Sequence, residues 1–223
     1  MHPIDPVKKA AAEAAAQLVQ DGMRVGLGTG STVAYLLPAL AARGLRDLRC
    51  VATSVETAKQ ASALGLPVES FDTLEELDIA IDGADQVTPE GWIVKGGGGA
   101  HTREKAVAAA AHRFVVIVGD NKLVDALHAP VPLELLSFGL AATLRRLREL
   151  GPVEIRAGWP PSPDNGVIAD YRGEVGDPAA LAARLAAAVG VVDHGLFPPA
   201  LTHDVLIAHD GADVEHRTLQ SAG

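Results

Sequence analysis

The chain has 223 residues, a formal net charge of −9 and 48% hydrophobic residues. This length allows a main domain with a smaller second one, and the composition is typical of a globular α/β protein rather than a disordered or fibrous one. The negative charge, with no basic stripe to offset it, excludes a nucleic acid or an anionic membrane as an expected partner. We expect a cytoplasmic protein, since no run approaches the roughly 20 apolar residues of a membrane span and no signal-peptide pattern is found. The single cysteine, Cys50, excludes an internal disulfide.

Helices and short apolar strands alternate over the first half of the chain. The pattern predicts helices over 5–20, 31–42, 55–64 and 101–111, and strands over 23–27, 48–52, 77–81 and 114–118. The last two strands are apolar throughout, which is typical of strands that are covered on both faces of a sheet. The alternation therefore predicts an α/β fold with a doubly wound, mostly parallel, Rossmann-like sheet.

The order of elements changes after Pro130. We predict strand 133–136, helix 138–150, strand 153–156, a turn over 160–166, strand 167–171, helix 178–189 and strand 191–194. This order is that of a ferredoxin-like α+β domain. We place such a domain, as a lid or an oligomerisation surface, at 131–203. It is inserted into a catalytic domain formed by 1–130 and 204–223, and strand 204–208 returns to the first sheet.

A glycine-rich loop joins the first predicted strand to the next helix. Its residues are Gly26, Leu27, Gly28, Thr29, Gly30, Ser31 and Thr32. Glycines let a backbone approach a ligand, and the free amides of a helix N-terminus attract an anion. The dinucleotide fingerprint needs glycine in place of Ser31, and the nucleotide phosphate loop needs Gly-Lys before the hydroxyl residue, so neither fits. The loop indicates a site for a single phosphate, with a tight turn capped by Ser31 as the alternative.

Two aspartates follow the third predicted strand, in the stretch Asp82-Gly83-Ala84-Asp85. Ligands of open α/β sheets bind beyond the carboxyl ends of the strands, which is where these acids stand. Paired acids share proton-transfer work when their surroundings separate their pKa values. The alternatives are a hard-metal site and an Asp-rich turn without a role. The metal is the weaker alternative, because no histidine stands in a recognisable ligand spacing.

A run of four glycines lies between a lysine and a predicted helix: Lys95, Gly96, Gly97, Gly98 and Gly99. Because such a run is entropically costly, it indicates that backbone amides line a ligand. Lys95 is placed to stabilise an oxyanion, and Glu104, in the first turn of the helix, to act as a general base. The alternative role of Glu104 is to complement the helix dipole. Together the three loops predict proton transfer next to a carbonyl in a small sugar phosphate.

These motifs resemble those of the A-type ribose-5-phosphate isomerases over nearly the whole chain. The matching stretches are TGST at 29–32, DGAD at 82–85, KGGGG followed by TREK at 95–105, GDNK at 119–122, VPLEL at 131–135, SPDNG at 162–166, GLF at 195–197 and DVLIAHDG at 204–211. DGAD and KGGG-to-REK in this order and at this spacing are highly specific, whereas each motif alone is weak.

The resemblance implies the reversible interconversion of ribose 5-phosphate and ribulose 5-phosphate in the non-oxidative pentose phosphate pathway. It implies that Glu104 moves a proton between C2 and C1 through an enediolate. Asp82 would assist ring opening, Asp85 would hold substrate hydroxyls, and Lys95 would stabilise the oxyanion. No metal and no other cofactor is expected.

The resemblance also implies a set of substrate-binding residues and an assembly. The binding positions are Thr29, Gly30, Ser31, Thr32, Gly83, Ala84, Gly96, Gly97 and Gly98, with Lys8 and Lys122 as cationic partners of the phosphate. Members of this family are usually homodimers or tetramers. We therefore expect a homodimer, with a tetramer as the alternative.

The sequence departs from the family pattern at a few places. Gln86 stands where an acid commonly follows DGAD, and His101 where an apolar residue is expected. The segment after Asn165-Gly166 is one residue short, and residues 198–202 extend the GLF loop. These departures bear on the small domain and the oligomeric interface rather than on the reaction.

Two rival functions belong to other classes. One is a sugar-phosphate-sensing module, since this fold also serves as the effector domain of some bacterial repressors. We find no room for a DNA-binding unit before the first strand, and the complete set of acids, lysine and base favours an enzyme. The other rival is an isomerase or acyl-transferring relative with a different substrate, against which the phosphate-binding hydroxyls argue.

Overall fold

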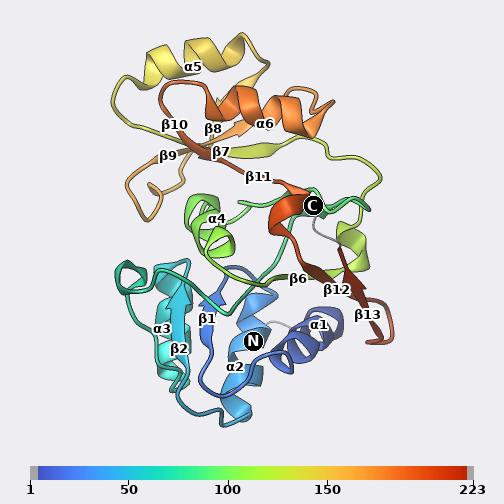
Figure 1. Cartoon of the computed structure of the whole chain (residues 1–223). Coiled ribbons are helices and arrows are strands. Elements are labelled where there is room, and N and C mark those ends of the chain that lie inside the picture. The colour runs from blue at the N-terminus through green and yellow to red at the C-terminus, as the bar shows by residue number, and fades with distance from the viewer. Residues whose placement is uncertain (1–4, 220–223) are drawn as a thin grey trace. The chain divides into compact units, whose positions relative to one another are not determined.

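The computed structural model describes residues 5–219, which form two compact units. The first unit comprises residues 5–84, 103–123 and 199–219, and the second comprises 85–102 and 124–198. Figure 1 shows the helices and strands of each. None of the helices in the described range has both the length and the apolar character that a membrane crossing needs.

A six-stranded sheet organises the first unit (Figure 1). In spatial order its strands are β13 (Val214–Thr218), β12 (Asp204–Ala208), β6 (Phe114–Gly119), β3 (Ile79–Asp82), β1 (Arg24–Leu27) and β2 (Arg49–Ala52). Neighbouring strands pair in parallel, except β12 and β13, which pair antiparallel. The predicted α/β class with a mostly parallel central sheet is confirmed, and β12 returns to this sheet as expected.

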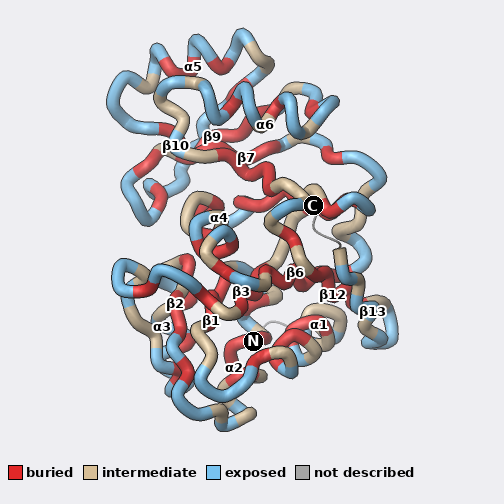
Figure 2. Tube along the Cα trace, in the orientation of Figure 1, coloured by how far each residue is buried: buried red, intermediate tan, exposed pale blue. Residues whose placement is uncertain are grey.

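Helices cover the sheet according to the alternation of side chains along its strands. The helices are α1 (Pro6–Ala16), α2 (Val33–Ala42), α3 (Val55–Ala63) and α4 (His101–Ala109), which belongs to the first unit from residue 103. Val25 and Leu27 of β1 pack with residues of α1 and α2 in one apolar core. Figure 2 shows β1 among the buried parts of this unit. Gly26 points to the opposite face. A Cβ there would lie 2.5 Å from Val107 of α4, so glycine lets this helix approach β1 closely.

Side chains bind the backbone at both ends of α1. The Asp5 carboxylate accepts the Lys8 N–H at 3.1 Å and caps the helix, with Pro6 in the first turn. The helix ends at Ala16, four residues before the predicted end. The next residues form tighter turns, in which the Leu18 N–H donates to the Ala15 carbonyl at 3.0 Å. Arg43 donates hydrogen bonds to the carbonyls of Ala16 and Val19.

An ion pair fixes β1 beside β3. The Arg24 guanidinium lies 2.8 Å from one Asp78 oxygen, and the Arg24 backbone N–H donates to the other at 2.7 Å. These hydrogen bonds lower the pKa of Asp78 to about 2. The pair holds the starts of the two strands in register, and their opposite ends carry the glycine loop and Asp82.

The second unit contains a four-stranded antiparallel sheet with two helices. The strands in spatial order are β10 (Val191–His194), β7 (Val131–Leu135), β9 (Val167–Tyr171) and β8 (Val153–Ile155), and the helices are α5 (Leu140–Arg148) and α6 (Pro178–Ala186). Along the chain the order is strand, helix, two strands, helix, strand, as predicted. The turn before β9 places Asn165 at φ 64°, in the left-handed region that asparagine tolerates.

A three-stranded sheet in the second unit was not predicted. It consists of β11 (Leu196–Phe197), β5 (Ile93–Val94) and β4 (Gln86–Val87). Two residues per strand are too few to show a period in the sequence. Because β4 and β5 pair with β11, residues 85–102 group with the second unit, whereas the sequence-based boundaries put them in the large domain.

Other segments were also missed or shifted. Strand β13 was not predicted, since it is an edge strand with mostly exposed polar residues. Short 3-10 turns occur at Phe71–Thr73, Asp120–Lys122 and Pro199–Leu201. Residues 199–203, which were assigned to the small domain, group with the first unit.

Candidate active site

The glycine loop and Asp82 lie at the carboxyl ends of two adjacent parallel strands. The loop follows β1, Asp82 ends β3, and the Gly28 N–H donates to the Ile81 carbonyl at 3.0 Å. The strand order reverses at β1, which has β2 on one side and β3 on the other. Such a switch point is where open α/β sheets bind ligands. The first unit therefore brings together two of the predicted site elements.

The Asp82 carboxylate is buried against the loop. Asp82 is only 2% exposed. Its Oδ1 accepts hydrogen bonds from the backbone N–H groups of Thr29 at 3.1 Å and Gly83 at 2.7 Å. A Cβ on Gly28 would lie 2.0 Å from the Asp82 Cγ, so only glycine fits there. The close approach explains why the loop needs a glycine at this position.

The hydroxyl residues of the loop are not used to build the turn as the capping alternative requires. Thr32, rather than Ser31, stands at the N-cap of α2, and its side chain makes no capping hydrogen bond. Ser31 is exposed. Gly30 has φ 115°, which a residue with a side chain rarely adopts. The turn is therefore not capped by Ser31 as the alternative requires, and the phosphate site stays a prediction.

Glu104 is buried in the first turn of α4, with 4% of its surface exposed. One turn later, Val107 packs against Gly26, and Gly26 is paired with Ala80 on the same face of the sheet. Asp82 is two residues after Ala80 and so faces that same side. A carboxylate that only complements a helix dipole needs no burial, whereas burial carries a free-energy cost. The burial of Glu104 exceeds what a helix-dipole role requires, and its role as a general base stays a prediction.

The two predicted cationic residues belong to the first unit. Lys122 is in the 3-10 turn that follows this strand, and Lys8 is in α1, with its Nζ 3.1 Å from the Asp5 carboxylate. A Cβ on Gly119 would lie 3.0 Å from Val7, so the start of α1 approaches the end of β6. Lys122 is thus at the carboxyl end of the sheet, and Lys8 follows Val7 and is paired with Asp5.

The second unit brings together Asp85, Lys95 and the glycine run. The Asp85 N–H donates to the Val94 carbonyl at 2.8 Å, and its Oδ2 accepts the Gly97 N–H at 2.8 Å. Lys95 follows β5 and is 3% exposed, with Nζ 5.9 Å from the centroid of the Phe197 ring. Burial of a charged amine costs free energy unless hydrogen bonds or an opposite charge compensate it.

Glycine is required at two positions of the run. Gly96 has φ 101°, and a Cβ there would lie 2.7 Å from the His101 ring. A Cβ on Gly97 would lie 2.8 Å from the Asp85 carboxylate. Local packing therefore explains these two glycines, and the prediction that the amides of the run line a ligand stays a prediction.

Two positions that depart from the family pattern have local explanations. Gln86 donates from Nε2 to the His128 carbonyl at 2.8 Å and accepts the His128 N–H at 2.9 Å. A carboxylate cannot make both bonds, because it has no donor when ionised. His101 is fully buried and packs against Gly96.

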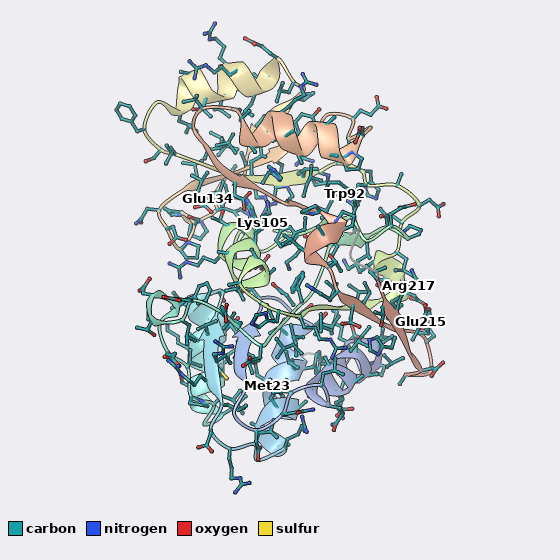
Figure 3. All side chains as sticks on the ribbon, viewed as in Figure 1. Met23, Trp92, Lys105, Glu134, Glu215 and Arg217 are labelled. Atoms are coloured by element: carbon teal, nitrogen blue, oxygen red, sulfur yellow. The ribbon has the colours of Figure 1, made fainter. Side chains whose placement is uncertain are left out.

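Two residues beside the glycine run were missed by sequence reasoning. Arg156 donates hydrogen bonds to the carbonyls of Gly96 and Gly97. Glu134 of β7, labelled in Figure 3, is 1% exposed and accepts hydrogen bonds from the hydroxyls of Thr102 and Ser162. Glu134 and Ser162 stand in the VPLEL and SPDNG motifs, so a signal was present for them without a role attached.

Among residues 5–219, no group of three or more histidine, cysteine, aspartate or glutamate side chains could hold a metal ion. The first unit carries the loop at 29–32, Asp82 and Glu104, and the second carries Asp85 and Lys95. The fold is that of an α/β protein, and its buried carboxylates and buried lysine are side chains of the kind that acid–base enzymes use.

Comparison with known proteins specifies this class further. The family model for ribose 5-phosphate isomerase A (phosphoriboisomerase A) matches residues 49–212. The chain is 45% identical over 204 residues to ribose-5-phosphate isomerase A of Caulobacter vibrioides. The aligned part covers 86% of this chain and 90% of that protein. It is 43% identical over 228 residues to the protein of that name from Chloroflexus aurantiacus, which covers 97% and 95%.

Solved structures give the same result. The ribose 5-phosphate isomerase A of Methanocaldococcus jannaschii superimposes with a TM-score of 0.89 at 32% identity, over 95% of this chain and 98% of that one. A D-ribose-5-phosphate isomerase in complex with phospho-erythronic acid has a TM-score of 0.90 at 30% identity, over 97% and 99%. The chain belongs to the ribose 5-phosphate isomerase A family, which confirms the resemblance found in the sequence.

Proposed function

We propose that this protein interconverts D-ribose 5-phosphate and D-ribulose 5-phosphate by general-base proton transfer through an enediolate. It is an aldose–ketose isomerase. The observation that carries the mechanism is the burial of Glu104, at 4% exposure, on the face of the sheet to which Asp82 also points. Two buried carboxylates on one side of a sheet offer the proton-transfer groups that the reaction requires.

Asp82 assists the opening of the furanose ring. Ring opening removes the proton of the C1 hydroxyl and delivers one to the ring oxygen, so a group that exchanges protons accelerates it. The amides of Thr29 and Gly83 hold the carboxylate in place through Oδ1. This fixed orientation lowers the entropy cost of the transfer.

Glu104 then removes the proton from C2 of the open-chain aldehyde. The electron pair of the C2–H bond forms the C1–C2 double bond, and negative charge develops on the C1 oxygen. Lys95 stabilises that charge, since a buried amine interacts more strongly with an anion than an amine in water does. The proton of the C2 hydroxyl then passes to the C1 oxygen, Glu104 returns its proton to C1, and the C2 carbonyl of the ketose forms.

The remaining residues bind the substrate. Asp85 and the backbone of Gly96, Gly97 and Gly98 hold sugar hydroxyls, as do the backbone groups of Thr29, Gly30, Gly83 and Ala84. Ser31, Thr32 and the amides at the start of α2 bind the phosphate, with Lys8 and Lys122 supplying positive charge.

The wider setting is also part of the proposal. The enzyme acts in the non-oxidative pentose phosphate pathway in the cytoplasm, without a metal, as a homodimer or alternatively a tetramer. Its large domain is Rossmann-like, and an inserted ferredoxin-like α+β domain serves as a lid or oligomerisation surface. The mostly parallel sheet and the strand order of the second unit support this description.

Substitution of both loop hydroxyls tests the phosphate site. In the variant Ser31→Ala with Thr32→Ala, we expect KM for ribose 5-phosphate to rise about 100-fold, because each lost hydrogen bond to a charged phosphate weakens binding by roughly tenfold. The rate at saturation should change much less, since the reacting carbons are untouched. Steady-state kinetics measures both quantities.

A matched control removes one serine hydroxyl and one threonine hydroxyl from another turn. Ser70→Ala with Thr73→Ala alters an exposed 3-10 turn of the first unit and should leave KM unchanged. An unchanged KM in the Ser31 and Thr32 variant as well would place the phosphate elsewhere.

A further inference from the structure

Arg156 connects the sheet of the second unit to the glycine run. It follows β8, and its Nη1 donates to the Gly96 carbonyl at 3.0 Å and to the Gly97 carbonyl at 3.1 Å. Only 11% of its side-chain surface is exposed. A guanidinium that donates hydrogen bonds to two consecutive carbonyls restrains the two peptide groups that contain these carbonyls.

The two bonds determine which way the following amides point. In a planar trans peptide group, the C=O and the next N–H point in opposite directions. With the Gly96 carbonyl turned to Arg156, the Gly97 N–H points away from it, and this N–H meets Asp85 Oδ2 at 2.8 Å. By the same geometry the Gly98 N–H also points away from Arg156, on an exposed stretch of the loop.

The guanidinium is itself held rigidly. Its Nε donates to Asp170 Oδ2 at 2.9 Å and its Nη2 to Asp170 Oδ1 at 2.7 Å, a two-bond pair in which the Asp170 side chain is 7% exposed. The Arg156 Cζ also lies 4.7 Å from the centroid of the Trp159 ring, within cation–π distance. Arg156 therefore has few alternative positions.

A run of four glycines needs such a restraint. Glycine loses more conformational freedom on ordering than any other residue, so an unrestrained run samples many backbone states. Binding that must first select one of these states is weakened. A fixed guanidinium selects the conformation in advance. Its charge also polarises the two peptide groups, which makes their N–H groups stronger donors.

We propose that Arg156 is a positioning residue for the isomerase reaction. It holds the carbonyls of Gly96 and Gly97, so that the Gly97 amide orients Asp85 and the Gly98 amide faces the substrate. Arg156 itself touches neither the sugar nor the phosphate. This inference rests on the proposed roles of Asp85 and of the glycine run.

The test compares Arg156→Lys with Arg172→Lys. Lysine keeps the positive charge but cannot bind two carbonyls and Asp170 at once, because it lacks the planar fork. We expect kcat of Arg156→Lys to fall about 100-fold, the size of effect that a small misplacement of reacting groups produces. KM should also rise, since the loop must then be ordered on binding, but by less than kcat falls, because the phosphate contacts are made by other residues.

Arg172 is the matched control. It pairs with Glu154, and its Nη2 lies 4.0 Å from the same Asp170 carboxylate. It is 46% exposed, so its replacement should leave kcat within about twofold of the wild type. Thermal unfolding of both variants shows how much of each is folded, and kcat is expressed per folded molecule. Equal kcat values for the two variants, or a loss in Arg156→Lys that follows only the folded fraction, would overturn the proposal.

A second variant separates geometry from charge. In Arg156→Ala, added methylguanidinium should restore part of kcat, whereas methylammonium should not, because only the former has the planar set of donors. Equal effects of the two ions would contradict a positioning role. Should Arg156→Ala fail to fold, Arg156→Lys still decides the question.

The test also separates failure of this inference from failure of the proposed site. Glu104→Gln and Lys95→Met, assayed alongside, address the site itself. If they lose turnover while Arg156→Lys retains it, the site stands and the positioning role is wrong. If they retain turnover, the proposed site is wrong.

Discussion

Glu104→Gln is expected to lower kcat by about 10³- to 10⁴-fold, the upper part of the range for loss of a general base. The amide has nearly the same shape as the carboxylate, so the 4%-exposed position should remain filled. A neutral amide cannot take the proton from C2. Binding of the sugar phosphate should persist, because the phosphate and hydroxyl contacts are made by other residues.

Initial rates and calorimetric titration with ribose 5-phosphate measure the two effects separately. The control is Glu56→Gln, since Glu56 is also an acid in the first turn of a helix, α3. That variant loses only the favourable interaction with the helix dipole, so its kcat should match the wild type. A Glu104→Gln variant with kcat within tenfold of the wild type would show that another group is the base.

Lys95→Met is expected to lower kcat by about 10²- to 10³-fold, as removal of one oxyanion-stabilising group does. Methionine retains most of the apolar stem but lacks the charged amine, whose Nζ lies 5.9 Å from the centroid of the Phe197 ring. The loss should appear mainly in kcat, because the negative charge on the C1 oxygen exists only after the proton has left C2.

Loss of stability has to be separated from loss of turnover. Lys95 is 3% exposed, and removal of one member of a buried polar contact is destabilising. Urea unfolding of the variant checks this point, and Lys59→Met on α3 serves as the surface control. A kcat of Lys95→Met equal to that of the control would remove Lys95 from the mechanism.

The core of the first unit could be predicted because its strands have a recognisable pattern in the sequence. Strands such as β6, whose residues are all buried, are continuous apolar runs between helices, and this pattern belongs to parallel sheets. The glycine loop and Asp82 were also predictable, since ligands gather where parallel strands end. Periodicity alone left the residue roles open between chemical and structural alternatives. The family motifs then supplied the roles proposed here, which stay predictions.

Features that depend on contacts between distant segments were not predictable. At the end of α1, Arg43 donates to carbonyls more than twenty residues earlier in the sequence. Arg156 binds the glycine run from 60 residues away in the sequence. The three short strands β4, β5 and β11 exist only because they pair with one another. None of these contacts leaves a local pattern, so the grouping of residues 85–102 with the second unit was missed.

The most direct test of proton transfer as the mechanism is the conversion of ribose 5-phosphate in D₂O by purified, EDTA-treated protein, followed by NMR. General-base transfer through an enediolate predicts conversion to ribulose 5-phosphate with deuterium from the solvent at C1, because a carboxyl group exchanges its proton with water. Absence of conversion would contradict the account. So would conversion that requires an added metal and carries the C2 hydrogen to C1 with no solvent deuterium.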